Sequence, residues 1–385
     1  MNTLKKLQNL NNSGKSYIIY KSKNGFDLYT NFSKKIILNN NNIIRFLKKK
    51  SKKDKLKNTD LYIGFFGYEL LNNLIGVKVP KQRTNKFPKG IFYKPEKKTH
   101  LPKDFLYNLS KPFNKKNDFK ININRKIYSK IFEKFKRKIK SGETYQIKIC
   151  TKYKKVSKIE PLDFFCRLSK VNLAPEAFMI KDKNYSIVSC SPENLITKKG
   201  SLITTKPIAG TVKKTKKMNK LRALNYFKKN IKENKEHNMI VDMERNDLSR
   251  ICKKGSVKLV KTKVVEEYKD LFHYVSLIKG KLNSKVASID IIKAMMPGGS
   301  VIGCPKINTL NLLNKQEKEN RNIYTGSFGF IKFNGDMRFN IIIRSILNYR
   351  NISEISVASG VVVDSSAKHE FEENYIKAKA LIDLY

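Results

Sequence analysis

The sequence predicts an α+β fold built on large antiparallel β-sheets. Three observations support this prediction. Runs with strand periodicity and runs with helix periodicity are mixed along the chain, and they do not follow strict βαβ alternation. In addition, 40% of the 385 residues are hydrophobic, 22 of them Phe, which is typical of a folded globular protein. The length suggests two lobes or one large domain with a sizeable core.

The strongest compositional signal is a net charge of +49. Dense Lys neutralises phosphates, so a basic nucleic-acid-binding protein is one hypothesis. The Lys residues, however, are spread along the whole chain, and no RNP strand or zinc-finger pattern accompanies them. We therefore expect no specific nucleic-acid partner, and we keep this class as the alternative to an enzyme.

The cysteines and the lengths of the apolar runs indicate in which cellular compartment the protein is expected. The cysteines are odd in number and show no CxxC spacing, which excludes a disulfide framework and a zinc site of that type. They are Cys150, Cys166, Cys190, Cys252 and Cys304. No apolar run approaches the roughly 20 residues of a membrane span, and residues 1–16 lack a signal-peptide core. We expect a cytoplasmic protein without a membrane partner.

The first 115 residues form a weaker, eroded N-terminal segment. Strand-like runs occur at residues 16–20 and 61–66, and we find no catalytic pattern there. We therefore divide the chain into an N-terminal lobe, residues 1–115, and a catalytic domain, residues 116–385.

The second part alternates irregularly between the two periods. Apolar residues recur at helical spacing over 126–141, and Gly142 ends that helix. A further helix is predicted at 161–168, and a Gly/Pro-rich turn at 296–306 leads into another. The predicted strands are 145–153, 177–180, 185–189, 201–205, 256–265, 269–278, 324–333, 339–347 and 355–363.

Two predicted helices carry acidic residues at helical spacing. In residues 232–250, Glu233 and Glu236 lie three positions apart and share a face. At the C-terminus, Glu370, Glu373 and Lys377 also share a face. Each stretch alone is compatible with ordinary charge pairing on a solvated surface. Together they could hold a hard divalent cation such as Mg²⁺, which takes carboxylate oxygens and keeps places for water and an anionic substrate.

Seven motifs in order resemble the chorismate-utilising enzymes, and within them anthranilate synthase component I and aminodeoxychorismate synthase component I. They cover roughly residues 125–385. They are SPENL (191–195), PIAGT (207–211), EHNMIVDMERNDLSR (236–250), PGGSVIGCPK (297–306), YTGSFGF (324–330), IIIRS (341–345) and EFEENYIKAKAL (370–381). The resemblance implies that the antiparallel sheets form a sandwich with helices packed outside, and that residues 1–115 correspond to the regulatory-type half.

The resemblance also implies a Mg²⁺-dependent reaction on chorismate, a dicarboxylate. Glu236 and Glu373 match the metal-ligating residues, and Glu233 and Glu370 match acids at or just behind the metal. This is physically reasonable, because a dication offsets the repulsion between protein carboxylates and an anionic substrate.

Catalytic roles follow from the same resemblance. Glu193 matches the general acid that protonates the departing 4-hydroxyl, which requires a raised pKa. Gln146 stands where isochorismate- and salicylate-forming members resemble one another in a water-activating lysine, so ammonia is the expected nucleophile. His273 matches a histidine linked to pyruvate elimination, and Lys377 matches a lysine near the acidic cluster. The residues that match substrate-binding positions are Gly210, Thr211, Tyr324, Arg344 and Gly360.

Two departures from the family pattern bear on regulation and binding. Ala358 stands where the family commonly has Gly, which affects the expected backbone contact with a carboxylate. Glu176 and Ala177 replace the Tyr-Met of members inhibited by tryptophan, and the LLES-type element of those members is not visible. We therefore expect no feedback inhibition by tryptophan.

Two products remain open. Aminodeoxychorismate synthases resemble one another in a nucleophilic lysine within PIAGT, where this chain has Ala209. We favour anthranilate for that reason, although three other stretches look more like the aminodeoxychorismate branch: residues 145–147, 174–175 and 297–299. A degenerate family member is a further alternative. No Cys nucleophile pattern for hydrolysing glutamine is visible, so we expect a hetero-oligomer in which a glutamine amidotransferase subunit supplies the ammonia.

Overall fold

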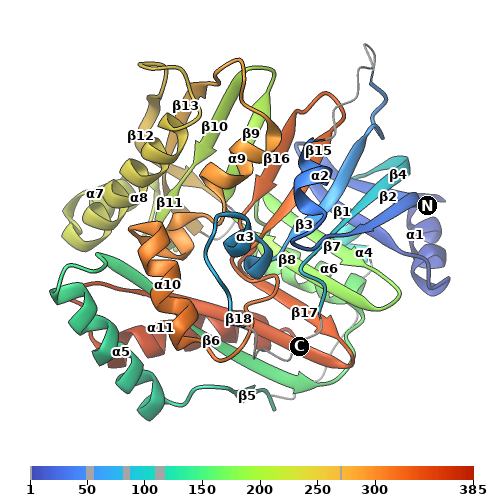
Figure 1. Cartoon of the computed structure of the whole chain (residues 1–385). Coiled ribbons are helices and arrows are strands. Elements are labelled where there is room, and N and C mark those ends of the chain that lie inside the picture. The colour runs from blue at the N-terminus through green and yellow to red at the C-terminus, as the bar shows by residue number, and fades with distance from the viewer. Residues whose placement is uncertain (1, 49–55, 81–86, 109–117, 269–270) are drawn as a thin grey trace.

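The structure is a computed structural model that describes residues 2–48, 56–80, 87–108, 118–268 and 271–385, which we call the described residues. The predicted α+β class and the large antiparallel sheet are confirmed (Figure 1). No helix in the described ranges is long and apolar enough to cross a membrane. The helices are α1 (Asn2–Asn12), α2 (Ile43–Lys48), α3 (Tyr68–Leu74), α4 (Phe105–Asn108), α5 (Arg125–Lys140), α6 (Pro161–Val171), α7 (Lys220–Lys229), α8 (Ile231–Ser249), α9 (Ser288–Met295), η1 (Gly299–Val301), α10 (Lys306–Gln316) and α11 (Ala367–Ile382).

The strands of the described residues join in one antiparallel network. They are β1 (Tyr17–Ser22), β2 (Gly25–Ile37), β3 (Leu61–Phe66), β4 (Gly90–Leu101), β5 (Lys120–Ile121), β6 (Gln146–Val156), β7 (Glu176–Lys181), β8 (Tyr185–Ser191), β9 (Asn194–Lys199), β10 (Leu202–Lys206), β11 (Ile208–Lys213), β12 (Lys258–Glu267), β13 (Leu271–Lys281), β14 (Gly303–Cys304), β15 (Ser327–Lys332), β16 (Met337–Asn340), β17 (Ser345–Tyr349) and β18 (Ile352–Val361).

The order of pairing shows how the two ends of the network are built. From β6 it runs through β18, β17, β8, β7, β1, β2, β4, β3, β15, β16, β9 and β10 to β13. At one end, β5 and β14 pair with β6; at the other, β11 and β12 pair with β13. In Figure 1 β12 and β13 lie at the upper left and β6 and β18 at the bottom. The helices that carry the acidic residues, α8 and α11, pack on these two ends.

The N-terminal segment supplies more structure than its sequence suggests. β1 pairs with β7, and β3 pairs with β15, so strands from residues 1–115 are hydrogen-bonded to strands of the later part. The 13-residue strand β2 and the 12-residue strand β4 have no counterpart among the predicted elements. Part of the predicted boundary, residues 109–117, lies outside the described residues. The division into two domains stays a prediction.

Two predicted strands are wrong in extent: the strand predicted at 324–333 is β15, which begins at residue 327, and the second is interrupted. The run 339–347 divides into β16 and β17, and residues 341–344 between them are not in a strand. Arg344 has a φ of 50°, which breaks the extended backbone. Apolar Ile341 and Ile342 are fully buried, so the hydrophobic run continues while the hydrogen-bonded ladder stops. The backbone therefore bends between β16 and β17, and Arg344 lies at this bend.

Local signals explain where α8 and α11 begin. Asn230 caps α8, because its side chain accepts a hydrogen bond from the Glu233 backbone N–H at 3.1 Å. Ser366 caps α11 by accepting from the backbone N–H of His369. α11 then packs Ala378, Leu381 and Ile382 into a core shared with β18. Both helices are thus fixed at the end from which their glutamates project.

The contact between the N-terminal strands and the rest of the sheet predicts a stability effect. Phe328 is fully buried, stacks on Phe178 with ring centroids 3.7 Å apart and meets the edge of Tyr20. We expect Phe328→Ala to lower the free energy of unfolding by about 3–5 kcal/mol, because it opens a cavity in a core formed by β1, β7 and β15. Urea denaturation measures this change. Val156→Ala, at a side chain that is 83% exposed, is the control and should change it by less than about 0.5 kcal/mol.

Candidate active site

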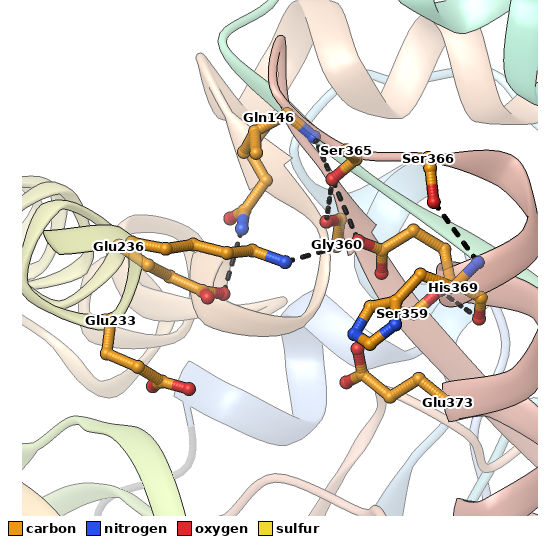
Figure 2. A network of polar contacts seen from close by, with 12 residues as sticks. Gln146, Glu233, Glu236, Ser359, Gly360, Ser365, Ser366, His369 and Glu373 are labelled. Atoms are coloured by element: carbon orange, nitrogen blue, oxygen red, sulfur yellow. Dashed lines mark hydrogen bonds and ion pairs between the residues drawn. The ribbon is translucent and has the colours of Figure 1, made fainter. Parts of the chain in front are cut away.

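The predicted acidic residues face a strand that the sequence analysis did not connect with them. On α8, Glu236 accepts hydrogen bonds through Oε1 from Gln146 Nε2 and from Lys148 Nζ, both at 2.8 Å. On α11, Glu373 pairs with Lys377 Nζ at 2.6 Å. We call Glu233, Glu236, Glu370 and Glu373 the acidic group. Figure 2 shows Glu233 and Glu236 on one side and Glu373 on the other, with Gln146 and Gly360 between them. The structure therefore brings the two acidic helices to one place.

Charge repulsion and ion pairing act in opposite directions on these carboxylates. Burial raises the pKa of Glu233, and the negative charges of Glu236 and Glu373 raise it further. Burial alone would raise the pKa of Glu236, but Lys148 and Gln146 lower it to about 2. For Glu373 the effect of burial is likewise outweighed, here by Lys377, and its pKa is lowered. The charged form of these carboxylates is therefore stabilised by positive charges such as those of Lys148 and Lys377.

Glu370 is the most deeply buried of the four acids, with 1% of its surface exposed. Its Oε1 accepts from Ser365 Oγ at 2.8 Å and from Lys232 Nζ at 3.3 Å. Within the described part of the chain, its Oε2 has no hydrogen-bond partner. A buried carboxylate oxygen without a donor is costly, so a cation nearby would stabilise it.

The residues present fit a hard divalent cation by their chemistry, since all four donors are carboxylates. Among the described residues, however, no three Asp, Glu, His or Cys side chains are grouped closely enough to enclose a metal ion. The ammonium groups of Lys148, Lys377 and Lys232 form ion pairs with Glu236, Glu373 and Glu370.

Glu193 lies between β8 and β9 in a site suited to a proton donor. It is 4% exposed, and its Oε1 accepts a hydrogen bond from Ser300 Oγ at 2.7 Å. Burial raises the pKa of Glu193 to about 7, despite the opposing effects of Ser300 and of the Lys148 charge. The interaction with Lys148 places Glu193 near the acidic group, and the raised pKa keeps a large fraction protonated near neutral pH.

His273 and Thr211 are neighbours on paired strands. β11 pairs with β13 so that Thr211 is opposite His273, and Thr211 Oγ1 lies 2.9 Å from His273 Nδ1. Burial, helped by the charge of Arg344, lowers the pKa of His273 to about 4. The imidazole is therefore neutral at pH 7 and can accept a proton.

The predicted substrate-binding residues connect these groups. Arg344 is half-buried, donates to Asn172 Oδ1 at 3.3 Å, and acts electrostatically on His273. Tyr324 is buried beside Ala358, whose carbonyl oxygen also accepts from Lys377 Nζ at 3.0 Å. Burial lowers the pKa of Arg344 from its usual value. Substrate-binding candidates therefore border both the His273 pair and the acidic group.

Two glycines line the approach to the acidic group. Gly210 has a φ of 93°, and a Cβ there would lie 2.8 Å from Glu233 Oε2 and from the Phe227 ring. At Gly360 a Cβ would lie 2.6 Å from Lys148 Nζ and 2.7 Å from Gln146 Nε2. Gly210, with its positive φ, therefore disfavours any side chain. At Gly360 a side chain would displace the ends of Lys148 and Gln146.

The surroundings of Gly360 predict a functional effect without a large effect on folding. We expect Gly360→Ala to lower kcat/KM roughly 10- to 100-fold, because the new methyl displaces the ends of Lys148 and Gln146 by about an ångström. The melting temperature should change little, since both displaced atoms are at flexible side-chain ends. Steady-state kinetics and a thermal melt measure the two effects. Gly329→Ala is the contrast: its Cβ would lie 1.9 Å from the Arg338 backbone oxygen, and it should lose stability instead.

Sequence reasoning missed three residues of the site. Lys148 lies two positions after Gln146, so strand periodicity could have placed both on one face. Ser300 had no signal beyond its place in the Gly-rich turn. Glu244 is 1% exposed and accepts from Thr205 Oγ1. Burial and the nearby charge of Glu193 raise the pKa of Glu244 well above its usual range.

Comparisons with known proteins show the family to which the chain is similar. A family model described as chorismate binding enzyme matches residues 11–383. Aminodeoxychorismate synthase component 1 of Bacillus subtilis (strain 168) is 37% identical over 255 residues, which are 66% of this chain and 54% of that protein. Anthranilate synthase component 1 1 of Haloarcula marismortui is 34% identical over 249 residues, 64% of this chain and 51% of that protein. The chain thus spans about half the length of these curated relatives.

The fold also matches a solved structure. The crystal structure of anthranilate synthase component I from Streptococcus pneumoniae TIGR4 superposes with a TM-score of 0.76 and 25% sequence identity, covering 95% of this chain and 90% of that one.

Proposed function

The chain belongs to the chorismate-binding enzymes, and on that premise we propose that it aminates chorismate with ammonia and eliminates pyruvate to give anthranilate. The overall reaction converts chorismate and ammonia into anthranilate, pyruvate and water. The observation that carries the proposal is Glu193, an acid whose burial raises its pKa to about 7 and which interacts with the charge of Lys148, the partner of Glu236.

The proposed cofactor is Mg²⁺. Glu236 and Glu373 would hold it, with Glu233 and Glu370 beside them. When bound, it would neutralise these carboxylates and bind a carboxylate of chorismate. The support is the carboxylate donor set, the buried Glu370 Oε2 without a partner, and the repulsion that raises the pKa of Glu233.

Glu193 would protonate the 4-hydroxyl as it leaves, because its carboxyl is still partly protonated near neutral pH. Gln146 cannot act as a base, and its amide is engaged with Glu236, which favours ammonia over activated water as the nucleophile. Arg344 and Tyr324 would orient the substrate. His273, neutral at pH 7, would accept the proton released when pyruvate departs.

The ammonia would come from a glutamine amidotransferase subunit. All five cysteines lie among the described residues, and four of them are buried. Burial raises the pKa of Cys150, Cys166 and Cys190 to about 12 and that of Cys252 to about 11, and it also raises the pKa of Cys304. A thiol nucleophile needs a lowered pKa, so none of these cysteines is suited to hydrolysing glutamine.

The second candidate is aminodeoxychorismate synthase component I, which the Bacillus subtilis relative favours. Against it, Ala209 is buried on β11 and has no nucleophilic group. We favour anthranilate because chemistry at the reacting position constrains the product more directly than overall similarity does.

One incubation tests the proposal. Purified protein with chorismate, Mg²⁺ and ammonium chloride should produce fluorescent anthranilate and an equal amount of pyruvate. A 4-amino product that becomes visible only after a lyase is added would support the second candidate. A folded protein that makes neither product contradicts both proposals and supports a degenerate family member.

A further inference from the structure

Lys148 is an ammonium group built into the acidic site. It leaves β6 on the same face as Gln146, two residues earlier. Its Nζ donates to Glu236 Oε1 at 2.8 Å, the oxygen that also receives Gln146. The Lys148 side chain is 13% exposed and that of Glu236 is 24% exposed. The pair thus links β6 to α8 across a partly dehydrated site.

The surroundings show that Lys148 is not an ordinary surface partner of Glu236. Its Nζ lies close against the backbone of β18, since a Cβ on Gly360 would come within 2.6 Å of it. Its charge also acts on Glu370, Glu373 and Glu193. Figure 2 shows Gly360 between Glu236 and Glu373. One ammonium therefore stands where the carboxylates of the two helices converge.

We propose that Lys148 is an internal counter-cation that neutralises Glu236 in the metal-free protein, leaves it when the carboxylate coordinates a divalent cation, and then pairs with a carboxylate of the substrate. This inference rests on the proposed function in one respect, namely that Glu236 is a metal ligand.

Two physical arguments support it. Glu236 Oε1 already accepts from Lys148 and Gln146, so a metal reaches this oxygen only after the pair is loosened. At the other oxygen, Oε2, the nearby ammonium charge would still repel a dication, so Lys148 and the metal compete for Glu236. If the Lys148 ammonium separates from Glu236, it is left partly buried without a counter-charge, which is unfavourable in free energy until another anion pairs with it. A dicarboxylate substrate supplies one. Metal and substrate binding should therefore be positively coupled through Lys148.

Calorimetric titration of the full chain with Mg²⁺ alone, without substrate, tests the competition. We expect Lys148→Met to bind Mg²⁺ at least tenfold more tightly than the wild type and to show a larger rise in melting temperature on adding Mg²⁺. Lys148→Arg, which keeps the charge, should retain the wild-type affinity. Lys154→Met is the matched control: it lies on the same strand and pairs with Glu319 outside the acidic group, so it should leave the affinity unchanged.

The coupling gives a second test. Adding chorismate should tighten Mg²⁺ binding in the wild type and should do so less in Lys148→Met. A double variant, Lys148→Met with Glu236→Gln, should gain less Mg²⁺ affinity over Glu236→Gln than Lys148→Met gains over the wild type, because the direct pair with Glu236 is already absent.

The outcomes separate this inference from the proposed function. If the wild type binds Mg²⁺ and makes product while folded Lys148→Met shows the same or a weaker affinity, the inference is overturned and the function stands. If Lys148→Met does not fold, a tighter affinity in Lys148→Arg overturns the inference as well. A wild type that neither binds Mg²⁺ nor makes product contradicts both.

Discussion

Glu193→Gln is expected to lower kcat by roughly 10²- to 10⁴-fold with little change in KM, the range that general acid catalysis contributes. Gln keeps the size and can still accept from Ser300 Oγ, but it cannot donate a proton to the leaving 4-hydroxyl. The loss should therefore appear in the chemical step and not in binding. Steady-state kinetics with ammonium as nitrogen donor measures it.

The pH dependence of the wild type gives the same test without a mutation. Because burial raises the pKa of Glu193 to about 7, the proton donor is present below pH 7 and is lost as the pH rises through that value. At a constant concentration of free ammonia, the rate should fall about tenfold per pH unit on the alkaline side. Glu193→Gln should lose this alkaline limb.

Stability provides the control for that variant. The pKa of Glu193 is raised from 4.5 to about 7 in the folded protein, so its contribution to stability is full below pH 4.5 and is lost as the pH rises through about 7. Glu193→Gln removes this loss and should melt at the same or a higher temperature than the wild type at pH 8. A variant that retains activity and its alkaline limb would show that another group donates the proton.

The second large effect is expected at the acidic group. Glu236→Gln and Glu373→Gln should each lower kcat/KM by about a thousandfold or more, since metal ions contribute several kcal/mol of charge stabilisation to such reactions. Each change removes one negative charge and a strong oxygen ligand. Kinetics at increasing Mg²⁺ concentration and calorimetric titration measure the loss.

Glu236→Gln and a third variant, Glu233→Gln, should differ in their effect on folding. Glu236→Gln leaves the buried Lys148 with a neutral partner, so its melting temperature should fall. Glu233→Gln should raise the melting temperature without added metal, because it removes a carboxylate whose pKa is raised by burial and by repulsion from Glu236 and Glu373. Glu372→Gln is the matched control, since this exposed residue precedes Glu373 on the same helix. A normal kcat/KM in Glu236→Gln would contradict the metal site.

Long periodic segments made several elements in both parts of the chain predictable. The helix predicted at 126–141 is α5 within one residue at each end, and the acidic helix at 232–250 is α8 shifted by one. The strand 61–66 is β3 without change. These segments combine a clear apolar period with a local stop or cap, such as Gly142 after α5 and Asn230 before α8.

The elements and site residues that the sequence did not predict depend on contacts between distant parts of the chain. The long strands β2 and β4 are stabilised by pairing with each other, and five of the 13 residues of β2 are exposed, so its apolar pattern is weak. Lys148 carries no signal of its own among 81 Lys and Arg residues. Its role appears only when β6 is placed against α8, 88 residues later.

A divalent cation held between α8 and α11 is the central claim, and the most direct measurement is anomalous X-ray scattering from crystals soaked in Mn²⁺ as a substitute for Mg²⁺. The account predicts one strong anomalous peak coordinated by Glu236 and Glu373, with Lys148 moved away from Glu236. A peak elsewhere in the molecule, or none at saturating Mn²⁺ with Lys148 still bound to Glu236, would contradict it.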